Sequence, residues 1–404
     1  MLKVGTLFSG GLAAPEFALR YESIKHEIIF ACEIDKYARK QYLEFHSHPK
    51  KEFYHDVKDI DGTKYYKTID LLVWGSPCQD LSLAGKRKGF EGSKSSLFRI
   101  GARIQDEIKP TNFIFENVTG LLSSNGGADY QEVVSTFREQ GYHLVTLKMN
   151  TKDYGIPQNR ERVFIVGFLD VDKYHNFREP TPKQLKIKLR DLLQKNVDKK
   201  YFLNDEQIKN FTKSTYHQER DRLQDENICT TLLSRDHKSP KLVQVGNIDQ
   251  KGHNSLWGRV YDPDGLAPTL NANGGGAGAK TGLYQIKSNT KCGYELANNY
   301  DCVNLAFPGS NTRRGRVGKE VSQTLDCGGT QGVIYDFMIR RLTPFETFLL
   351  QGVKAEDIKL INSDTQSYKI SGNAISVNVM QELLKALYKQ SSTQKNSLFD
   401  FASA

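Results

Sequence analysis

A regular alternation of strand-like and helix-like segments over residues 1–170 constrains the fold most strongly. Short apolar runs end in turns that contain glycine or proline, and stretches with helical periodicity follow them. The predicted strands cover residues 4–8, 27–32, 69–74, 112–115, 144–149 and 162–168, and the predicted helices cover 13–21, 36–45, 97–109 and 130–140. This alternation predicts an α/β fold of the Rossmann-like, doubly wound type, with helices on both faces of the sheet.

The pattern changes after about residue 175, where helix signals become sparse and Gly, Asn, Thr and Ser become frequent. The run 271–276 is a loop by composition. Helical sequence returns at Met338, with Pro344 near a helix start and an apolar periodic run over 375–387. We therefore expect a first domain at 1–175 plus 336–390, an inserted, smaller and irregular β-rich domain at 176–335, and a polar tail at 391–404.

Charge and cysteine content narrow the class of protein. The net charge of +9 favours nucleic acid or another anionic partner, although a merely basic protein would show it too. Six cysteines without C-x-x-C spacing predict free thiols and no metal site. Because neither a signal peptide nor an apolar run of about 18 residues is present, we expect a cytoplasmic protein that does not contact a membrane.

The first predicted strand ends in a glycine turn, Phe8-Ser9-Gly10-Gly11. Glycines at this place let a ligand approach the backbone and the helix N-terminus. Glu33 ends the second predicted strand, about 20 residues after the turn, where a carboxylate accepts hydrogen bonds from ribose hydroxyls. The pair predicts a nucleoside cofactor, and it does not separate a dinucleotide from S-adenosylmethionine.

Cys78 follows the third predicted strand, and Glu116 closes the fourth. Parallel strands would bring both residues to one edge of the sheet, where a thiol and a carboxyl suit nucleophilic attack assisted by an acid. A lone cysteine is more often a buried filler, and a strand-end glutamate is often only solvated. The basic run Lys86-Arg87-Lys88 would lower the thiol pKa, contact phosphates or simply face solvent.

Two arginines, Arg160 and Arg162, precede the last predicted strand. At positions i and i+2 of an extended segment they point to the same side. They would then clamp a phosphate or a carboxylate together.

These motifs occur together in the order found in one family. The chain resembles the bacterial and phage DNA (cytosine-5)-methyltransferases of restriction-modification systems, over almost its whole length except about 175–335. The resemblance rests on Phe8-Ser9-Gly10, Gly75-Ser76-Pro77-Cys78-Gln79, Glu116-Asn117-Val118, Gln158-Asn159-Arg160-Glu161-Arg162, Arg341-Leu342-Thr343-Pro344, Gln351-Gly352 and Gly372-Asn373.

The resemblance implies a reaction and its catalytic residues. A target cytosine leaves the duplex, because its C6 atom is unreachable inside the stack. Cys78 then corresponds to the nucleophile that adds to C6, and Glu116 to the residue that holds and protonates N3. Arg162, with Arg160 and Asn117, corresponds to the groups that bind the base carbonyl and order the site. The methyl group comes from S-adenosylmethionine, which leaves as S-adenosylhomocysteine.

The resemblance also implies a cofactor site. Its residues would be Phe8, Ser9, Gly10, Gly11, Glu33, Ile34, Asp56, Val57, Pro77, Leu97 and Asn373. Two positions depart from the family pattern: Leu12 stands where a second glycine is usual, and Ala84 replaces a serine of some relatives. The first departure puts the individual contacts of residues 9–13 in doubt, and the second a polar contact to DNA.

A weak repeat in the second domain bears on DNA recognition. Arg259 leads to Thr269-Leu270, and Arg316 leads to Thr324-Leu325. Recurrent hairpins would explain the repeat equally well. The first copy resembles the target-recognition segment of relatives that read short GC-rich sites, and we favour it over the second. The expected DNA contacts are Gln79, Lys86, Arg87, Arg259, Thr269 and Leu270.

The sequence thus predicts an enzyme that acts on double-stranded DNA as a monomer. It would protect DNA in a phage or in a restriction-modification system with a cognate endonuclease. Three alternatives are a DNA-binding regulator without activity, a tRNA cytosine-5 methyltransferase of the same family, and a nicotinamide oxidoreductase. The intact Cys78, Glu116 and Arg162 oppose the first, the long stretch 175–335 opposes the second, and Pro77-Cys78-Gln79 is unexplained by the third.

Overall fold

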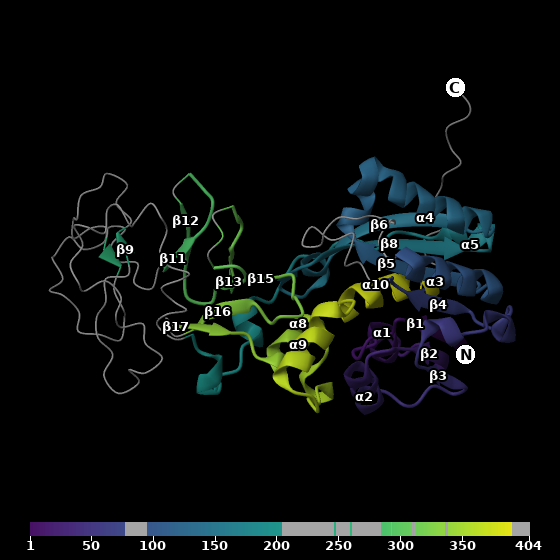
Figure 1. The fold of residues 1–404 in the computed structure, drawn as a ribbon, viewed down its shortest axis with the longest axis horizontal. Helices are drawn as coiled ribbons and strands as arrows, with labels where there is room; N and C mark the ends of the chain where they lie inside the picture. Colours follow the sequence, from purple (N-terminus) through teal and green to yellow (C-terminus); the bar gives the residue numbers. More distant parts are fainter. Residues whose placement is uncertain are drawn as a thin grey trace, which may run out of the picture. The chain divides into compact units, whose positions relative to one another are not determined.

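The computed structural model describes residues 1–76, 95–203, 246–247, 259–260, 284–291, 293–308, 310, 312–335 and 338–389 (Figure 1). The chain divides into two compact units. Unit 1 comprises residues 1–154, 161–183 and 375–404, and unit 2 comprises 155–160 and 184–374.

Unit 1 is built on a seven-stranded sheet of order β3-β2-β1-β4-β5-β8-β6. Its first five strands in that order pair in parallel, whereas β8 is antiparallel to both of its neighbours. The sheet is therefore mixed rather than wholly parallel. Its strands are β1 (Leu2–Leu7), β2 (His26–Cys32), β3 (Glu52–Tyr54), β4 (Leu71–Trp74), β5 (Asn112–Val118), β6 (His143–Asn150) and β8 (Glu161–Phe168).

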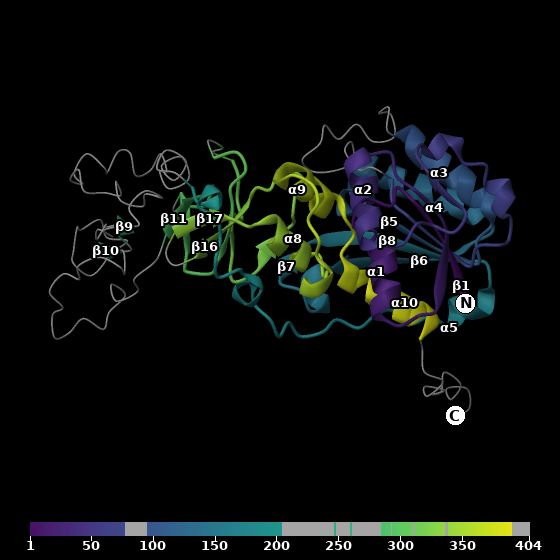
Figure 2. The ribbon, with the colours of Figure 1, turned by 90° about the horizontal axis from the view of Figure 1, so that it is seen from below.

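Helices cover both faces of this sheet, which confirms the predicted α/β fold. Figure 2 shows α3 and α4 on one side of the strands and α1 and α10 on the other. The helices of unit 1 are α1 (Ala14–Tyr21), α2 (Lys36–Phe45), α3 (Ser95–Ile108), α4 (Ala128–Glu139), α5 (Val171–Asn176) and α10 (Val377–Tyr388). Short 3-10 helices lie at Val57–Asp59, Gly62–Tyr65, Thr119–Gly127 and Thr151–Tyr154.

The last helix belongs to the first unit because charges tie it to α1. Glu22, just beyond the end of α1, accepts ion pairs from Lys385 at 3.1 Å and Lys389 at 3.3 Å, both near the end of α10. These bonds hold the pKa of Glu22 below its usual range, against the opposing effect of burial. The return of the chain to its first domain, expected from 336 onward, occurs with α10.

An aromatic core holds the ends of β4 and β5 in place. The Trp74 ring stacks on Phe98 of α3, with centroids 5.9 Å apart, and meets Phe115 edge-on at 4.7 Å. Its indole N–H donates to Gln105 at 2.8 Å, so the one polar atom of the ring is satisfied. A Cβ on Gly101 would lie 2.5 Å from the Trp74 ring, so only glycine lets α3 approach β4 this closely.

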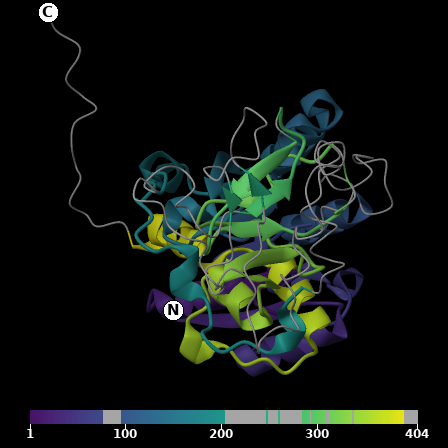
Figure 3. The same ribbon diagram turned by 90° about the vertical axis from the view of Figure 1, so that its left-hand side faces the viewer.

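Unit 2 is β-rich, as predicted (Figure 3). A four-stranded antiparallel sheet of order β14-β13-β16-β17 forms its centre, beside the hairpin β11-β12. The strands are β11 (Tyr284–Lys287), β12 (Tyr294–Ala297), β13 (Cys302–Asn304), β14 (Val317–Gly318), β16 (Gln331–Tyr335) and β17 (Met338–Arg341). Two-residue strands pair as β7 (Gln158–Asn159) with β15 (Ser322–Gln323) and β9 (Gly246–Asn247) with β10 (Arg259–Val260).

Among its described residues, unit 2 also contains the helices α8 (Pro344–Leu350) and α9 (Asp364–Asn373), and 3-10 turns at Leu189–Leu192, Lys199–Tyr201 and Ala355–Asp357. Thr343 caps α8 with Pro344 at its first position, as the sequence suggested. Arg340 of β17 makes two 2.8 Å bonds to Glu346 of α8, and both side chains are fully buried. This ion pair fastens α8 to the sheet. In the division into units, residues 336–374 fall in unit 2.

Glu16 of α1 is buried beside Tyr42, whose hydroxyl donates to Oε1 at 3.0 Å, and its Oε2 has no hydrogen-bond partner among the described residues. Burial raises the pKa of Glu16 to about 7. The folded protein therefore keeps the Glu16 proton up to about pH 7, whereas the unfolded chain releases it near 4.5. Stability consequently falls as the pH rises through this window.

We predict that Glu16→Gln removes this loss. The unfolding free energy of the variant should rise by about 3 kcal/mol relative to that of the parent between pH 4.5 and pH 8. This is the free energy that corresponds to the raised pKa of Glu16. Chemical denaturation at a series of pH values measures the difference. An equal pH dependence for parent and variant would show that Glu16 is not the group responsible.

Candidate active site

The predicted site residues of unit 1 follow strands that run in the same direction. The strands β1, β2, β4 and β5 are neighbours and parallel, so their carboxyl ends meet at one edge of the sheet. The turn after β1, Glu33 after β2, Ser76 after β4 and Glu116 in the last part of β5 lie along this edge. The structure thus places Glu33, Ser76 and Glu116 at one edge of the sheet, and the expected place of Cys78 beside them stays a prediction.

Glu116 and Arg162 form an ion pair at this edge. The Arg162 Nε lies 3.1 Å from Glu116 Oε1, and the two side chains are 17% and 15% exposed. The pairing of β5 with β8 sets this contact, since Arg162 lies opposite Val118 and Glu116 opposite Phe164. A charge-assisted pair that keeps some exposure can hold a carboxyl in a fixed direction and still meet a ligand.

The residues that follow β4 pack closely against Glu116 and its neighbour Asn117. A Cβ on Gly75 would lie 2.8 Å from the Glu116 carbonyl oxygen and 3.0 Å from its Oε2, so a larger residue has no room. Asn117, which is 1% exposed, donates from Nδ2 to the Ser76 hydroxyl at 3.3 Å. The chain that leads to Cys78 therefore starts beside Glu116. Pro77, Cys78, Gln79, Lys86 and Arg87 lie outside the described residues.

Arg160 does not share the position of Arg162, which corrects the expectation that the two point to one side. Its guanidinium is 3% exposed and donates to the carbonyl oxygens of Leu325 at 3.3 Å and Ala374 at 2.7 Å. Arg160 belongs to unit 2 and Arg162 to unit 1. A guanidinium whose hydrogen bonds go to buried backbone carbonyl oxygens stabilises the fold. Sequence spacing alone could not show that Arg160 has this role.

The turn after β1 meets Glu33 directly. The Glu33 carboxylate accepts the backbone N–H of Gly10 and of Asp35, each at 2.8 Å. Burial raises the pKa of Glu33, against the lowering effect of these two bonds. Gly10 has φ +66°, and an added Cβ would meet no atom within 4 Å. The turn therefore combines a left-handed glycine with open space beside a fixed carboxylate, which is what a nucleoside ligand requires.

Other predicted cofactor residues divide into packed and accessible ones. Ile34 is 60% exposed beside the Glu33 carboxylate. Val57 is buried in the core of unit 1, and Leu97 packs against that core, so the side chain of Val57 is not available to a ligand. Asp56 uses Oδ1 to accept the Lys58 N–H at 3.0 Å. A contact of Asp56 with the cofactor would therefore use its other carboxylate oxygen.

Three more residues of the predicted cofactor set are fixed by their own contacts. The Ser9 hydroxyl bonds to Thr6 at 2.7 Å and accepts the Cys32 N–H at 3.2 Å. Gly11 is buried, and Phe8 takes a left-handed φ of +53°. Leu12, where the family pattern suggested glycine, is fully buried and packs inward.

Asn373 ends α9 in unit 2, where its Oδ1 accepts the thiol of the exposed Cys327 at 2.8 Å. Its predicted place in the cofactor site stays a prediction.

The two copies of the repeat differ in what the structure describes. Thr269 and Leu270 lie outside the described residues, and only the backbone of Arg259 is described. In the second copy Arg316 is 1% exposed and Leu325 is 3% exposed. An arginine buried in this way cannot read a base edge. The second copy therefore has no arginine at this position that could contact a base. The preference for the first copy stays a prediction.

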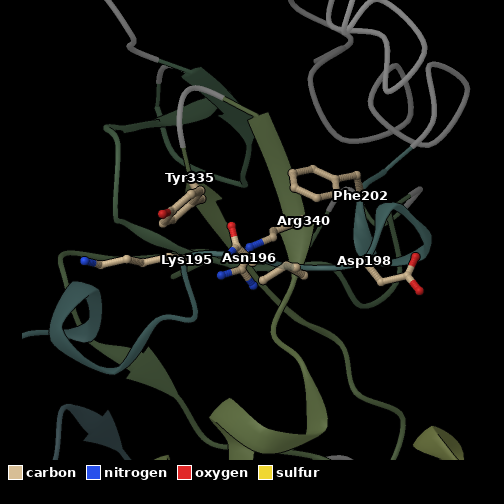
Figure 4. Close-up of a pocket in the computed structure, with 7 residues that line it drawn as sticks. Lys195, Asn196, Asp198, Phe202, Tyr335 and Arg340 are labelled. Carbon is tan, nitrogen blue, oxygen red and sulfur yellow. The ribbon is translucent and has the colours of Figure 1, made fainter.

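A cavity of about 400 Å³ lies in unit 2, and its walls include no predicted site residue (Figure 4). Its walls are Lys195, Asn196, Val197, Asp198, Phe202, Tyr335 and Arg340. The charge of Arg340 is already neutralised by Glu346. Within the described ranges, no cluster of three or more His, Cys, Asp and Glu side chains could hold a metal ion, and no helix is long and apolar enough to cross a bilayer.

Comparison with known proteins gives a consistent family assignment. The family model for C-5 cytosine-specific DNA methylases matches residues 2–389. The orphan methyltransferase M.SPRI of Bacillus phage SPR is 32% identical, over 96% of this chain and 97% of its own length. The type II methyltransferase M.HhaI of Haemophilus parahaemolyticus is 33% identical, over 68% of this chain and 76% of its own length.

Solved structures share the fold. A putative DNA modification methyltransferase encoded within an Escherichia coli prophage superposes with a TM-score of 0.55 at 19% identity, covering 96% of this chain and 99% of that one. A DNMT2 variant from Spodoptera frugiperda gives 0.56 at 15% identity, covering 96% and 100%.

The different surroundings of the two arginines predict different effects on stability. Arg160→Met should lower the unfolding free energy by about 3 kcal/mol, because it leaves two buried carbonyl oxygens without a donor. Arg162→Met removes a partly exposed pair and should cost about 1 kcal/mol or less. Denaturant unfolding of both variants and the parent measures these two losses of unfolding free energy. The reverse order of stabilities would contradict the assignment of Arg160 to structure.

Proposed function

The chain belongs to the C-5 cytosine-specific DNA methylase family and is a DNA (cytosine-5)-methyltransferase, and from this premise we propose that Cys78, Glu116 and Arg162 carry its reaction. The observation that supports the proposal most strongly is the ion pair of Glu116 with Arg162 beside Gly75 and Ser76. That pair lies where the chain enters the segment that contains Cys78.

Methylation at cytosine C5 requires a nucleophile and a proton donor that act on the same cytosine ring. Cytosine C5 is a weak nucleophile, so the Cys78 thiolate first forms an S–C6 bond and opens the C5=C6 double bond. The displaced electron pair moves toward N3, where Glu116 supplies a proton and prevents negative charge from building up on the ring. C5 is then the nucleophilic atom of a neutral enamine.

The same groups reverse their roles at the end of the reaction. When C5 carries the methyl group, its hydrogen leaves as a proton to a base, the S–C6 bond breaks, and Glu116 takes back the proton at N3. The Arg162 guanidinium keeps the Glu116 carboxyl directed at N3 and donates to the base carbonyl. Asn117 acts as a positioning residue, because its side chain holds Ser76 at the start of the Cys78 segment.

Cys78 is favoured over the cysteines that the structure describes. Burial raises the pKa of Cys32 to about 12 and that of Cys302 to about 11, so both stay protonated thiols at neutral pH. The exposed Cys327 donates its thiol to Asn373 Oδ1 at 2.8 Å. Cys78 follows Ser76 by two residues, and a chain spans at most about 3.6 Å per residue, so the Cα atoms of Cys78 and Ser76 are within about 7 Å.

We propose that S-adenosylmethionine is the methyl donor and that the turn after β1 binds it. Bound there, it supplies a methyl group activated by a sulfonium. The donor set fits: the Glu33 carboxylate suits ribose hydroxyls, Gly10 leaves open space, and the exposed Ile34 offers an apolar face to an adenine. Phe8, Ser9, Gly11, Asp56, Val57, Pro77, Leu97 and Asn373 complete the proposed site, with Val57 contributing through its backbone.

The substrate we propose is duplex DNA with a short specific site, from which the target cytosine is flipped. Unstacking one base costs a few kcal/mol, which contacts to the DNA must supply. Gln79, Lys86 and Arg87 would contribute contacts near the target base, and Arg259, Thr269 and Leu270 would read the site. We expect the protein to act as a monomer and to protect DNA in a phage or beside a cognate endonuclease.

We predict transfer of label from tritiated S-adenosylmethionine to duplex DNA. Cys78→Ser should abolish it, because a hydroxyl is a far weaker nucleophile at neutral pH. Glu116→Gln should lower kcat by a factor of about 100 to 10,000, the usual contribution of a general acid.

Scintillation counting of the DNA measures the transfer, and the Leu360→Ala variant, changed at a surface position in unit 2, serves as a matched control. Label in tRNA with none in duplex DNA would contradict the substrate assignment. Full activity of Cys78→Ser would contradict the nucleophile. Bisulfite sequencing of the methylated duplex DNA then gives the methylated sequence.

A further inference from the structure

An aromatic side chain in unit 2 is held outward in a conformation that it would not adopt unaided. Phe307 is 70% exposed and has φ +50°. Non-glycine residues disfavour this left-handed region, and a residue before proline, as Phe307 is before Pro308, is driven to extended backbone. Surrounding contacts must therefore impose this backbone conformation, which carries the ring outward.

The buried Arg316 supplies those contacts. Its guanidinium donates to the carbonyl oxygens of Asn304 at 3.0 Å, Ala306 at 2.9 Å and Phe307 at 2.8 Å. Three bonds from one planar group to three carbonyls of a short segment fix its path. Arg316, the sequence's less favoured alternative to Arg259, thus acts as a positioning residue for Phe307.

Arg313 lies beside the ring, and the backbone around the adjacent Arg314 is held by hydrogen bonds. Glu295 of β12 accepts the backbone N–H of Gly315 at 3.0 Å and of Val317 at 2.9 Å, and the Arg313 carbonyl accepts the Asn289 N–H at 2.8 Å. The backbone on both sides of Arg314 is therefore held. The Arg313 guanidinium lies 5.4 Å from the centroid of the Phe307 ring.

The charge of this segment is positive and only partly neutralised. Residues 305–319 include four basic side chains and no acidic one. Arg316 is buried on carbonyl oxygens, and Lys319 pairs with Asp301 at 2.8 Å. Arg313 and Arg314 form no ion pair with any residue that the structure describes, so their charges are available to an anionic partner.

We propose that Phe307, Arg313 and Arg314, which we call the Phe307 tip, bind the DNA substrate directly. The Phe307 ring packs on a base, and the two guanidinium groups contact backbone phosphates on either side of it. This inference rests on the proposed function and adds a contact that neither copy of the sequence repeat supplied.

Physical reasons favour DNA over a protein partner. Arginines beside an aromatic ring match a polymer that alternates anionic phosphates with flat apolar bases. Extrusion of a cytosine interrupts the base stack and exposes base faces, and apolar side chains are used as wedges between base steps. Because Arg316 fixes the backbone at Phe307 before binding, little backbone conformational entropy is lost there when DNA is bound.

The test compares tip variants with matched controls in DNA binding and methylation. The variants are Phe307→Ala and the double variant Arg313→Gln with Arg314→Gln. The controls are Leu360→Ala for an exposed apolar residue and Lys186→Gln for an exposed cation of the same unit. The probe is a duplex that contains the methylated sequence, titrated at several salt concentrations. A Phe307→Tyr variant should retain binding, since the ring is kept.

We expect Phe307→Ala to weaken binding by about 5- to 150-fold, the range for loss of one stacked base, with an unchanged salt dependence. The arginine double variant should reduce the slope of log K against log salt by nearly two, one for each lost phosphate contact. Thermal unfolding of Phe307→Ala should match the parent, because the lost ring is exposed. Binding of either tip variant within twofold of its control would overturn the proposal.

Two other outcomes separate the sources of failure. If Phe307→Ala dissociates a dimer of this chain and leaves DNA affinity unchanged, the tip is a contact between copies, and the proposal is overturned. If the parent protein methylates duplex DNA while the tip variants match their controls, only this inference fails. If the parent transfers no methyl group to DNA, the proposed function itself fails.

Discussion

Parallel hydrogen bonding between β1, β2, β4 and β5 is the constraint on which the rest of the site depends. It forces four strand ends, from distant parts of the chain, to one edge of the sheet. The strands carry no chemistry of their own, yet they bring Glu33 to the Gly10 turn and Glu116 to Ser76. The close fit of Trp74 on Gly101 keeps β4 at a fixed distance from α3, so that edge is also rigid.

Much of this edge could be predicted because it depends on local signals. Strands and helices in unit 1 followed from apolar period and turn residues, and α2 begins and ends where the sequence placed it. The convergence of Glu33, Glu116 and the segment before Cys78 needed only the rule that parallel strands end together. Short elements such as β3 (Glu52–Tyr54) carry too few residues to show a period, and they could not be found this way.

Non-local contacts explain what sequence reasoning missed. The expectation for Arg160 and Arg162 assumed one continuous strand, but β7 ends at Asn159 and pairs with β15, while β8 begins at Glu161 and pairs with β5. Arg160 stands between these two partners, so the two-residue period is broken there. Sequence spacing could not exclude Arg316 as the alternative to Arg259 for a similar reason, since burial on backbone carbonyls depends on a loop fold that spacing does not encode.

The central claim is that Cys78 attacks a cytosine that Glu116 and Arg162 hold. A duplex with 5-fluorocytosine at the methylated position tests it most directly. A base can remove the C5 hydrogen as a proton but cannot remove a C5 fluorine, so elimination is blocked and the S–C6 bond persists after methyl transfer. The account predicts a denaturant-resistant complex of protein and DNA, formed only with S-adenosylmethionine, whose cross-linked peptide contains Cys78. A complex through another cysteine, or none from a preparation that methylates ordinary DNA, would contradict the account.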